Sequence, residues 1–421
     1  MTAVVKTKAV SGPEGTSIRE TPVPQPGAAE VLIRVIATAV CGSDKHIYQW
    51  DPSMASMVTP PRVYGHEFCG EIVAFGPGGA RPHLSEGQYV SAEMHVTCGH
   101  CRPCRTGQRH ICENTRILGV HGDGCFAQYV VVPAFNVVPL DRRVVPPKVG
   151  AFLDALGNAV HTTQVVDLSG RSVAVLGYGP IGAMCAEIAR VSGASHIAIT
   201  EVNAHATAHA RRWAKARGLG NVTVLDLTRT KDAAESLREA TGGGADVVLE
   251  LSGAEASINL GLAAARRGAT VSLLGLPKEN AVTIRDYTND LIFKGLTLHA
   301  VIGRRVFETW IKMLDLLAAG LDVADFVTNE FEGLEQFHEA MALLEDRRAM
   351  KVVFYPNGKP TEGPKSKVQS SRIPRAEETR VRSPEGTRRK RSSGYLGPWT
   401  LDLGPWTLDF GLLIQEPSPG P

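Results

Sequence analysis

The chain has 421 residues, of which 43% are hydrophobic and 21% charged, and its formal net charge is +2. This length exceeds what one hydrophobic core usually serves, so two or three domains are expected. The near-neutral charge argues against a nucleic-acid-binding protein, and no apolar run reaches the roughly 18 residues that span a bilayer. Because the start "MTAVVKTKAV" lacks an apolar signal-peptide core, we expect a cytoplasmic protein with a small-molecule partner and no membrane partner.

The first part of the chain, residues 1–155, carries short valine-rich runs that are broken by glycine and proline. This pattern predicts a domain of short strands and turns. From about residue 170, apolar strands alternate with helical segments, which is typical of a doubly wound parallel sheet in an α/β fold. After residue 297 follow two amphipathic helices and the closing strand "MKVVFYP".

Residues 359–421 differ in composition from the rest of the chain. Eleven Lys or Arg and four Glu fall between Lys359 and Arg391, and "LGPWTLD" then occurs twice in tandem, at 396–402 and 403–409. We predict a disordered basic tail. Such a tail could contact nucleic acid or an anionic surface, but a charge run is more often only solvated, and we predict no such partner.

Four of the eight cysteines form a cluster with the spacing C-x2-C-x2-C-x7-C: Cys98, Cys101, Cys104 and Cys112. Disulfides are disfavoured because cytosolic thiols stay reduced. A ferredoxin-like run has its fourth cysteine after three residues, followed by proline, whereas here seven residues intervene and glutamate follows. The spacing therefore favours a structural zinc site in a lobe at 93–115. Because a four-thiolate site leaves no open position on the metal, catalysis must take place elsewhere in the protein.

A second metal constellation lies upstream, in "AVCGSDKHIYQW" and "YGHEFCGEI". A catalytic zinc takes three protein ligands of mixed cysteine, histidine and carboxylate type and leaves one position open, which Cys41, His66 and a carboxylate fit. Taken alone, a cysteine is more often a residue packed in the core than a metal ligand, and a histidine beside a glutamate more often forms a hydrogen-bonded pair with it. Three further cysteines are expected to be small core residues. They are Cys69, Cys125 and Cys185.

The segment "VAVLGYGPIGAMCAEIA" places G-x-G-x-x-G, at Gly177, Gly179 and Gly182, between an apolar strand and a helix. These glycines allow a tight turn, the approach of a pyrophosphate and close packing of helix on strand in dinucleotide-binding folds. Glu201 ends the next strand, nineteen residues after Gly182. A carboxylate there binds both ribose hydroxyls and repels a 2′-phosphate, which predicts NAD rather than NADP, unless the glutamate simply faces water.

The order of "CGSDKH", "GHE", the cysteine quartet and "GYGPIG" resembles that of the zinc-dependent medium-chain alcohol dehydrogenases, over about residues 4–357. The resemblance implies a GroES-like catalytic domain formed by 1–155 and 297–358, with a Rossmann NAD-binding domain at 156–296 between them. It also implies a homotetramer. The tail, 359–421, lies outside the resemblance.

The resemblance assigns the catalytic zinc to Cys41, His66 and Glu67, which with the quartet makes two zinc ions per subunit. Asp154 of "LDALGN" would adjust this zinc or the proton relay, and the residues alone do not decide between ligation and tuning. His95 occupies a position that the family links to substrate choice.

The resemblance further implies that Ser43 and His46 relay the substrate proton to solvent. Ser43 stands where threonine is usual, and Ala206 where an arginine near the adenosine ribose is usual. The implied cofactor contacts, besides the glycines, are Ile181, Glu201, Leu274, Gly275, Leu276, Val301 and Ile302.

Within the family the closest resemblance is to the branch that oxidises L-threonine at C3. It is carried by "CGSDKHIYQWD", "EMHVTCGHCRPCRTGQRHIC", "DALGNAVHT" and "GRRVFETWIKM". We therefore expect conversion of L-threonine and NAD to 2-amino-3-oxobutanoate and NADH. The alternatives are a polyol or secondary-alcohol dehydrogenase of the sorbitol or butanediol type, and a non-catalytic binding protein that acts through its tail. No motif specifies the groups that bind the substrate's amino and carboxylate ends.

Overall fold

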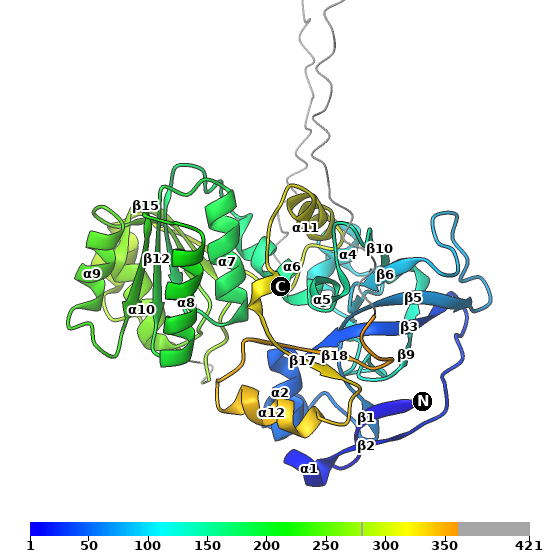
Figure 1. Ribbon diagram of the computed structural model, residues 1–421. Helices are drawn as coiled ribbons and strands as arrows, with labels where there is room; N and C mark the ends of the chain where they lie inside the picture. The colour runs from blue at the N-terminus through cyan, green and yellow to red at the C-terminus, as the bar shows by residue number, and fades with distance from the viewer. Residues whose placement is uncertain (279–280, 361–421) are drawn as a thin grey trace, which may run out of the picture. The chain divides into compact units, whose positions relative to one another are not determined.

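The computed structural model of the protein describes residues 1–278 and 281–360 (Figure 1). It confirms the predicted α/β class, with a six-stranded parallel sheet and a separate, mainly antiparallel β-rich part. The predicted disordered tail lies, from residue 361 onward, outside the described residues. In the described ranges, no helix is both long enough and apolar enough to cross a membrane.

The parallel sheet has the strand order β13-β12-β11-β14-β15-β16. Its central strand, "SVAVL", is buried along its whole length because helices cover both faces. The chain order reverses between β11 and β14, and ligands of such sheets bind at this point, beyond the carboxyl ends of the strands. The strands are β11 (Ser172–Leu176), β12 (His196–Glu201), β13 (Val222–Asp226), β14 (Ala245–Glu250), β15 (Ala265–Leu273) and β16 (Thr297–Ala300). The helices between them are α7 (Pro180–Val191), α8 (Ala204–Ala216), α9 (Ala233–Ala240) and α10 (Glu255–Ala264), followed by the π-helix η3 (Thr288–Ile292).

The β-rich part is built around a seven-stranded sheet in the order β10-β6-β5-β3-β18-β17, with β9 pairing β3. Two of its strands, β17 and β18, come from residues 327–355, far from the others in sequence, and β18 runs antiparallel to β3. The strands are β3 (Glu30–Ala39), β5 (Glu67–Phe75), β6 (Tyr89–Ala92), β9 (Tyr129–Pro133), β10 (Val137–Pro139), β17 (Val327–Glu332) and β18 (Lys351–Tyr355).

Smaller elements complete the β-rich part, and several of them carry candidate site residues. A three-stranded sheet contains β1 (Thr2–Lys6), β2 (Thr16–Glu20) and β4 (Arg62–Val63), and a two-stranded sheet contains β7 (His95–Val96) and β8 (Arg116–Ile117). The helices are α1 (Gly12–Gly15), α2 (Gly42–Gln49), α3 (Pro52–Ala55), α4 (Arg102–Arg105), η1 (Arg109–Ile111), η2 (Ala134–Asn136), α5 (Pro147–Gly150), α6 (Leu153–Thr163), α11 (Glu308–Ala318), η4 (Ala324–Phe326) and α12 (Phe337–Glu345).

Two predicted domain boundaries fall inside structural units. Helix α6 runs through the boundary placed at residue 155. Strand β16, placed at the start of the returning segment 297–358, instead pairs with β15 and completes the parallel sheet. Most of its residues are exposed, so the strand lacks the pattern of buried residues by which a strand of that sheet would be recognised. The division into domains otherwise stays a prediction.

The three cysteines outside the predicted metal sites are core residues, as the sequence predicted. Cys69, Cys125 and Cys185 have no exposed surface. Burial raises the pKa of the Cys69 thiol to about 12, so this thiol stays protonated at neutral pH. They are unsuited to redox or metal chemistry at this depth.

Candidate active site

The cysteine quartet forms one compact cluster in the lobe between β7 and β8. The four Sγ atoms all lie within 4.8 Å of one another, with Cys98 to Cys112 at 3.5 Å and Cys101 to Cys112 at 3.8 Å. Ligands 2.3 Å from a tetrahedral zinc are separated by about 3.8 Å. Backbone N–H groups of Cys101 and His100 lower the pKa of Cys98 to about 6, which favours the thiolate that binds metal. The donor set fits a closed zinc site.

Replacing Cys104 with serine is expected to remove the zinc of this cluster and so to lower the zinc content by one ion per chain. The thermal midpoint should fall by roughly 5–10 °C because metal-binding energy is folding energy in such lobes. Elemental analysis and calorimetry measure both effects. His100→Gln is the matched control, since the exposed His100 side chain bonds through Nδ1 to the carbonyl oxygen of Cys98 at 3.0 Å and supplies no thiol to the cluster. A Cys104→Ser protein that retains two zinc ions would contradict the assignment.

Four further donors meet at a second centre, although they come from distant parts of the chain. Ligand atoms of Cys41, His66, Glu67 and Asp154 lie within 4.8 Å of one another. Cys41 caps the start of α2, His66 and Glu67 stand at the start of β5, and Asp154 lies in the first turn of α6. All but Cys41 are buried, and a thiol, an imidazole and carboxylates are the ligands of catalytic zinc.

The second centre contains polar atoms that fit a cation. Glu67 Oε1 is buried and has no hydrogen-bond partner among the described residues, whereas His66 Nδ1 lies 3.6 Å from Asp44 Oδ1. Burial by itself lowers the pKa of His66, but its interactions with Asp44 and Cys41 outweigh burial and raise that pKa to about 10. A site this negative attracts a positive ion, and the unpaired acceptor of Glu67 needs one.

Buried charges outside the predicted set hold these ligands in place. Lys351, at the start of β18, contacts Glu67 Oε2 and donates to the carbonyl oxygen of Val40 at 2.8 Å. Asp44 accepts from the backbone N–H of Cys41 at 2.8 Å. Sequence reasoning missed Lys351, and the available signal was a lysine at the edge of the apolar run "KVVFY".

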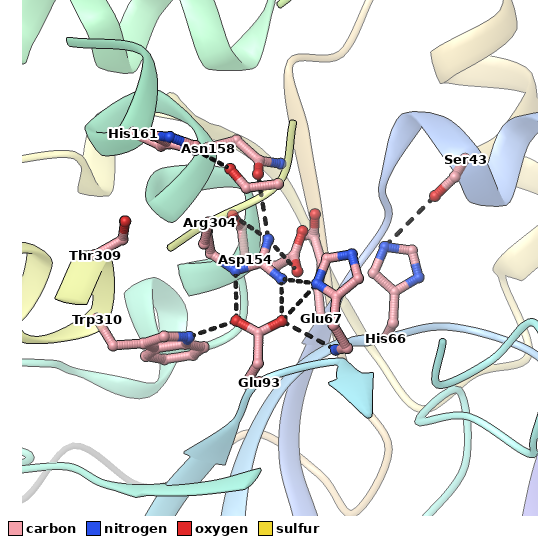
Figure 2. A network of polar contacts seen from close by, with 12 residues as sticks. Ser43, His66, Glu67, Glu93, Asp154, Asn158, His161, Arg304, Thr309 and Trp310 are labelled. Carbon is pink, nitrogen blue, oxygen red and sulfur yellow. Dashed lines mark hydrogen bonds and ion pairs between the residues drawn. The ribbon is translucent and has the colours of Figure 1, made fainter. Parts of the chain in front are cut away.

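A buried network of ion pairs centred on Arg304 surrounds Asp154 (Figure 2). Arg304 Nη1 lies 2.8 Å from Asp154 Oδ1, and its Nη2 donates to Glu93 Oε1 at 2.6 Å. Glu93 Oε2 also accepts from Trp310 Nε1 at 2.7 Å. Burial would raise the pKa of Glu93, but Arg304 and His95 hold it well below its usual range. Sequence reasoning did not identify Glu93, Arg304 or Trp310.

His95, predicted to influence substrate choice, belongs to this network. Its Nδ1 lies 2.7 Å from Glu93 Oε1, and the ring is buried. A Cβ atom at Gly303 would come within 3.2 Å of the His95 ring, so the chain after β16 passes directly over it. His95 therefore connects the quartet lobe to the chain segment that follows β16.

The two relay candidates lie on one face of α2, one turn apart. Ser43 Oγ is 3.5 Å from His66 Nε2, so it faces the metal centre. His46 lies three residues further on and is half-exposed, with its Nδ1 in contact with Asp51. The structure thus brings Ser43 to the second centre and places His46 toward solvent.

A cavity of about 1380 Å³ runs from Cys41 and Glu67 to the end of the parallel sheet. It is the expected place for a dinucleotide in a sheet of this order. Its lining includes six predicted cofactor residues, Gly177, Gly179, Ile181, Gly182, Glu201 and Leu276. Four others do not line it, namely Leu274, Gly275, Val301 and Ile302.

The glycine loop has the local geometry that the motif requires. Gly177 has φ +94°, a left-handed conformation that favours glycine, and a Cβ atom at Gly182 would lie 2.0 Å from the Gly177 oxygen. Glu201 accepts from the backbone N–H of Tyr178 at 2.7 Å, and of Val202 and Asn203 at 2.8 Å. Oε1 accepts two of these hydrogen bonds and Oε2 one, so Oε2 keeps a lone pair for a ribose hydroxyl.

Comparison with known proteins agrees with this geometry. Residues 27–142 match the family described as alcohol dehydrogenase GroES-like domain, and 180–319 match zinc-binding dehydrogenase. The chain is 42% identical to the L-threonine 3-dehydrogenase of Caldanaerobacter subterraneus, over 85% of this chain and 99% of that protein. The chain belongs to the medium-chain zinc alcohol dehydrogenase family. The corresponding enzyme of Pyrococcus horikoshii is 39% identical, over 84% of this chain and 98% of that one.

Solved structures of dehydrogenases share the fold. An alcohol dehydrogenase from Thermus sp. ATN1 superposes with a TM-score of 0.73 at 28% identity, over 84% of this chain and 99% of that one. A short-chain alcohol dehydrogenase of Escherichia coli CFT073, complexed with NADH, gives 0.72 at 25% identity, over 84% and 99%. The protein is therefore a zinc-dependent alcohol dehydrogenase with GroES-like and Rossmann parts, as the sequence predicted.

Proposed function

We propose that the protein oxidises the C3 hydroxyl of L-threonine with NAD, forming 2-amino-3-oxobutanoate, NADH and a proton. The observation that carries the proposal is similarity to proteins named L-threonine 3-dehydrogenase, at 39–42% identity over 84–85% of this chain and 98–99% of those proteins. Convergence of Cys41, His66, Glu67 and Asp154 supports zinc-dependent chemistry on an alcohol. Two zinc ions per subunit, a homotetramer and a cytoplasmic location complete the proposal.

Each group in the site has a distinct task in this reaction. Zinc, held by Cys41, His66 and Glu67, would supply a Lewis acid that lowers the pKa of the substrate hydroxyl. NAD, held along the glycine loop, would accept the hydride that leaves C3. Ser43 takes the hydroxyl proton and passes its own proton to His46, which is open to solvent.

Charge placement supports Asp154 as a tuning group. Its Oδ1 lies 2.8 Å from Arg304 Nη1, so the buried carboxylate already has a cationic partner on one side. The network that ends in Glu93 and His95 keeps the orientation of this carboxylate fixed. Asp154 therefore adds negative charge beside the zinc ligands without having to bind the metal.

The test is to offer the zinc-loaded protein L-threonine, sorbitol or 2,3-butanediol, each with NAD and, in parallel, with NADP. Formation of NADH or NADPH is followed in each case. We expect a kcat/KM for L-threonine with NAD at least about a hundredfold above the other combinations. L-allo-threonine and L-serine serve as matched substrates, since the first inverts only the C3 stereocentre and the second lacks only the methyl group. Preference for a polyol would replace the threonine assignment while keeping zinc and hydride chemistry.

A further inference from the structure

Asp51 lies at the solvent end of the line of residues that begins at the metal centre. Ser43 faces His66, and His46 follows one turn later on α2. The chain then turns so that Asp51 contacts His46 Nδ1 through its Oδ2 atom. The exposed fractions of the two side chains are 54% for His46 and 30% for Asp51, so the pair stands at the exit to water.

The position of Asp51 is fixed independently of the His46 side chain. Its Oδ1 accepts hydrogen bonds from Ser53 N at 3.1 Å, Ser53 Oγ at 2.6 Å and Met54 N at 3.2 Å, as the N-cap of α3. Its backbone N–H donates to the carbonyl oxygen of His46 at 3.2 Å. One carboxylate oxygen thus holds the loop while the other meets the imidazole.

The contact determines which ring nitrogen of His46 is available. Because Asp51 only accepts hydrogen bonds, His46 Nδ1 must carry the proton in the neutral ring. Nε2 is then left with its lone pair free to receive a proton. Other titratable groups packed on α2 make different contacts: Lys6, His338 and Glu345 contact Tyr48 or Gln49, and His66 contacts Ser43 and Asp44.

We propose that Asp51 is a positioning residue that completes a Ser43–His46–Asp51 relay, a role that rests on the proposed dehydrogenase function. Ser43 receives the alcohol proton and gives its own proton to His46 Nε2. The imidazolium keeps its Nδ1 proton on Asp51 and later loses the Nε2 proton to water. Asp51 orients the ring and stabilises its charged form, and it does not itself become protonated.

Asp51→Asn tests the proposal because asparagine is an equally good helix cap. With its oxygen retained in the cap, the amide NH2 would face His46 Nδ1 as a donor and favour the opposite tautomer. We expect ¹⁵N NMR of the histidine-labelled full chain to show Nδ1–H in the wild type and mainly Nε2–H in Asp51→Asn. His46→Gln assigns the resonance, and Ser53→Ala, which weakens only the cap, should leave the tautomer unchanged.

Kinetics supply the second readout. Asp51→Asn should lower kcat about tenfold, a fraction of the roughly 10²–10⁴ of a general acid–base group, and leave the KM for NAD nearly unchanged. In the His46→Gln background the same change should have no further effect. An unchanged tautomer, or an equal loss in both backgrounds, would overturn the relay role. The NMR result holds even for an enzyme with a different alcohol substrate, so failure of the threonine assignment is recognised separately.

Discussion

Replacing Arg304 with leucine is expected to lower the free energy of unfolding by about 3–5 kcal/mol, the cost of removing one partner from a buried ion pair. The guanidinium has no exposed surface, and neither has the Glu93 side chain to which it donates two hydrogen bonds. Asp154, its other partner, is 7% exposed. Two buried carboxylates would thus lose their guanidinium partner, and denaturant unfolding monitored by tryptophan fluorescence measures the loss.

The double variant Glu93→Gln with Arg304→Met is the matched control for this expectation. It removes one negative and one positive charge together and keeps side chains of similar length. We expect its free energy of unfolding to lie closer to the wild-type value than that of Arg304→Leu does, because fewer buried charges stay unpaired. If the double variant is as unstable as the single one, packing rather than charge accounts for the loss.

Replacing Cys41 with serine is expected to lower kcat at least about a thousandfold and to leave one zinc per chain. Lewis-acid activation is worth several kcal/mol, and each 1.36 kcal/mol corresponds to about a factor of ten. Serine keeps the size of the side chain but is a poor zinc ligand, so the second centre would lose its only thiolate. Elemental analysis and NADH formation measure the two effects on one preparation.

Cys185→Ala is the matched control because this thiol is buried in α7, away from both clusters. It should keep two zinc ions and wild-type turnover. A Cys41→Ser protein that keeps both zinc ions and full activity would show that the second centre does not act through metal. Loss of both zinc ions would instead show that the two sites depend on one another.

Short-range patterns accounted for the parts of the site that lie close together in sequence. The spacing of Cys98, Cys101, Cys104 and Cys112 predicted a compact cluster, because short loops between cysteines bring the thiols together with little loss of chain entropy. The glycine motif predicted the loop at Gly177 and the helix that follows, because its geometry depends on positive φ and close backbone contact. The order of strands and helices likewise predicted the parallel sheet.

Contacts between distant segments decided the rest. Arg304 reaches Glu93 across 211 positions, and Lys351 reaches Glu67 across 284, so no local pattern marks either residue as part of the site. Strand β16 lacks a pattern of buried residues, and only its pairing with β15 places it in the parallel sheet.

Even the nearby pair His46 and Asp51 required the turn after α2, since a spacing of five residues does not bring side chains together on a continuous helix. By itself, the sequence determined the donor atoms, the glycine loop and the fold class, because these depend on residue type and local backbone geometry. The tertiary structure decided which buried charges surround those donors, because a charge can be buried only where folding brings a partner to it.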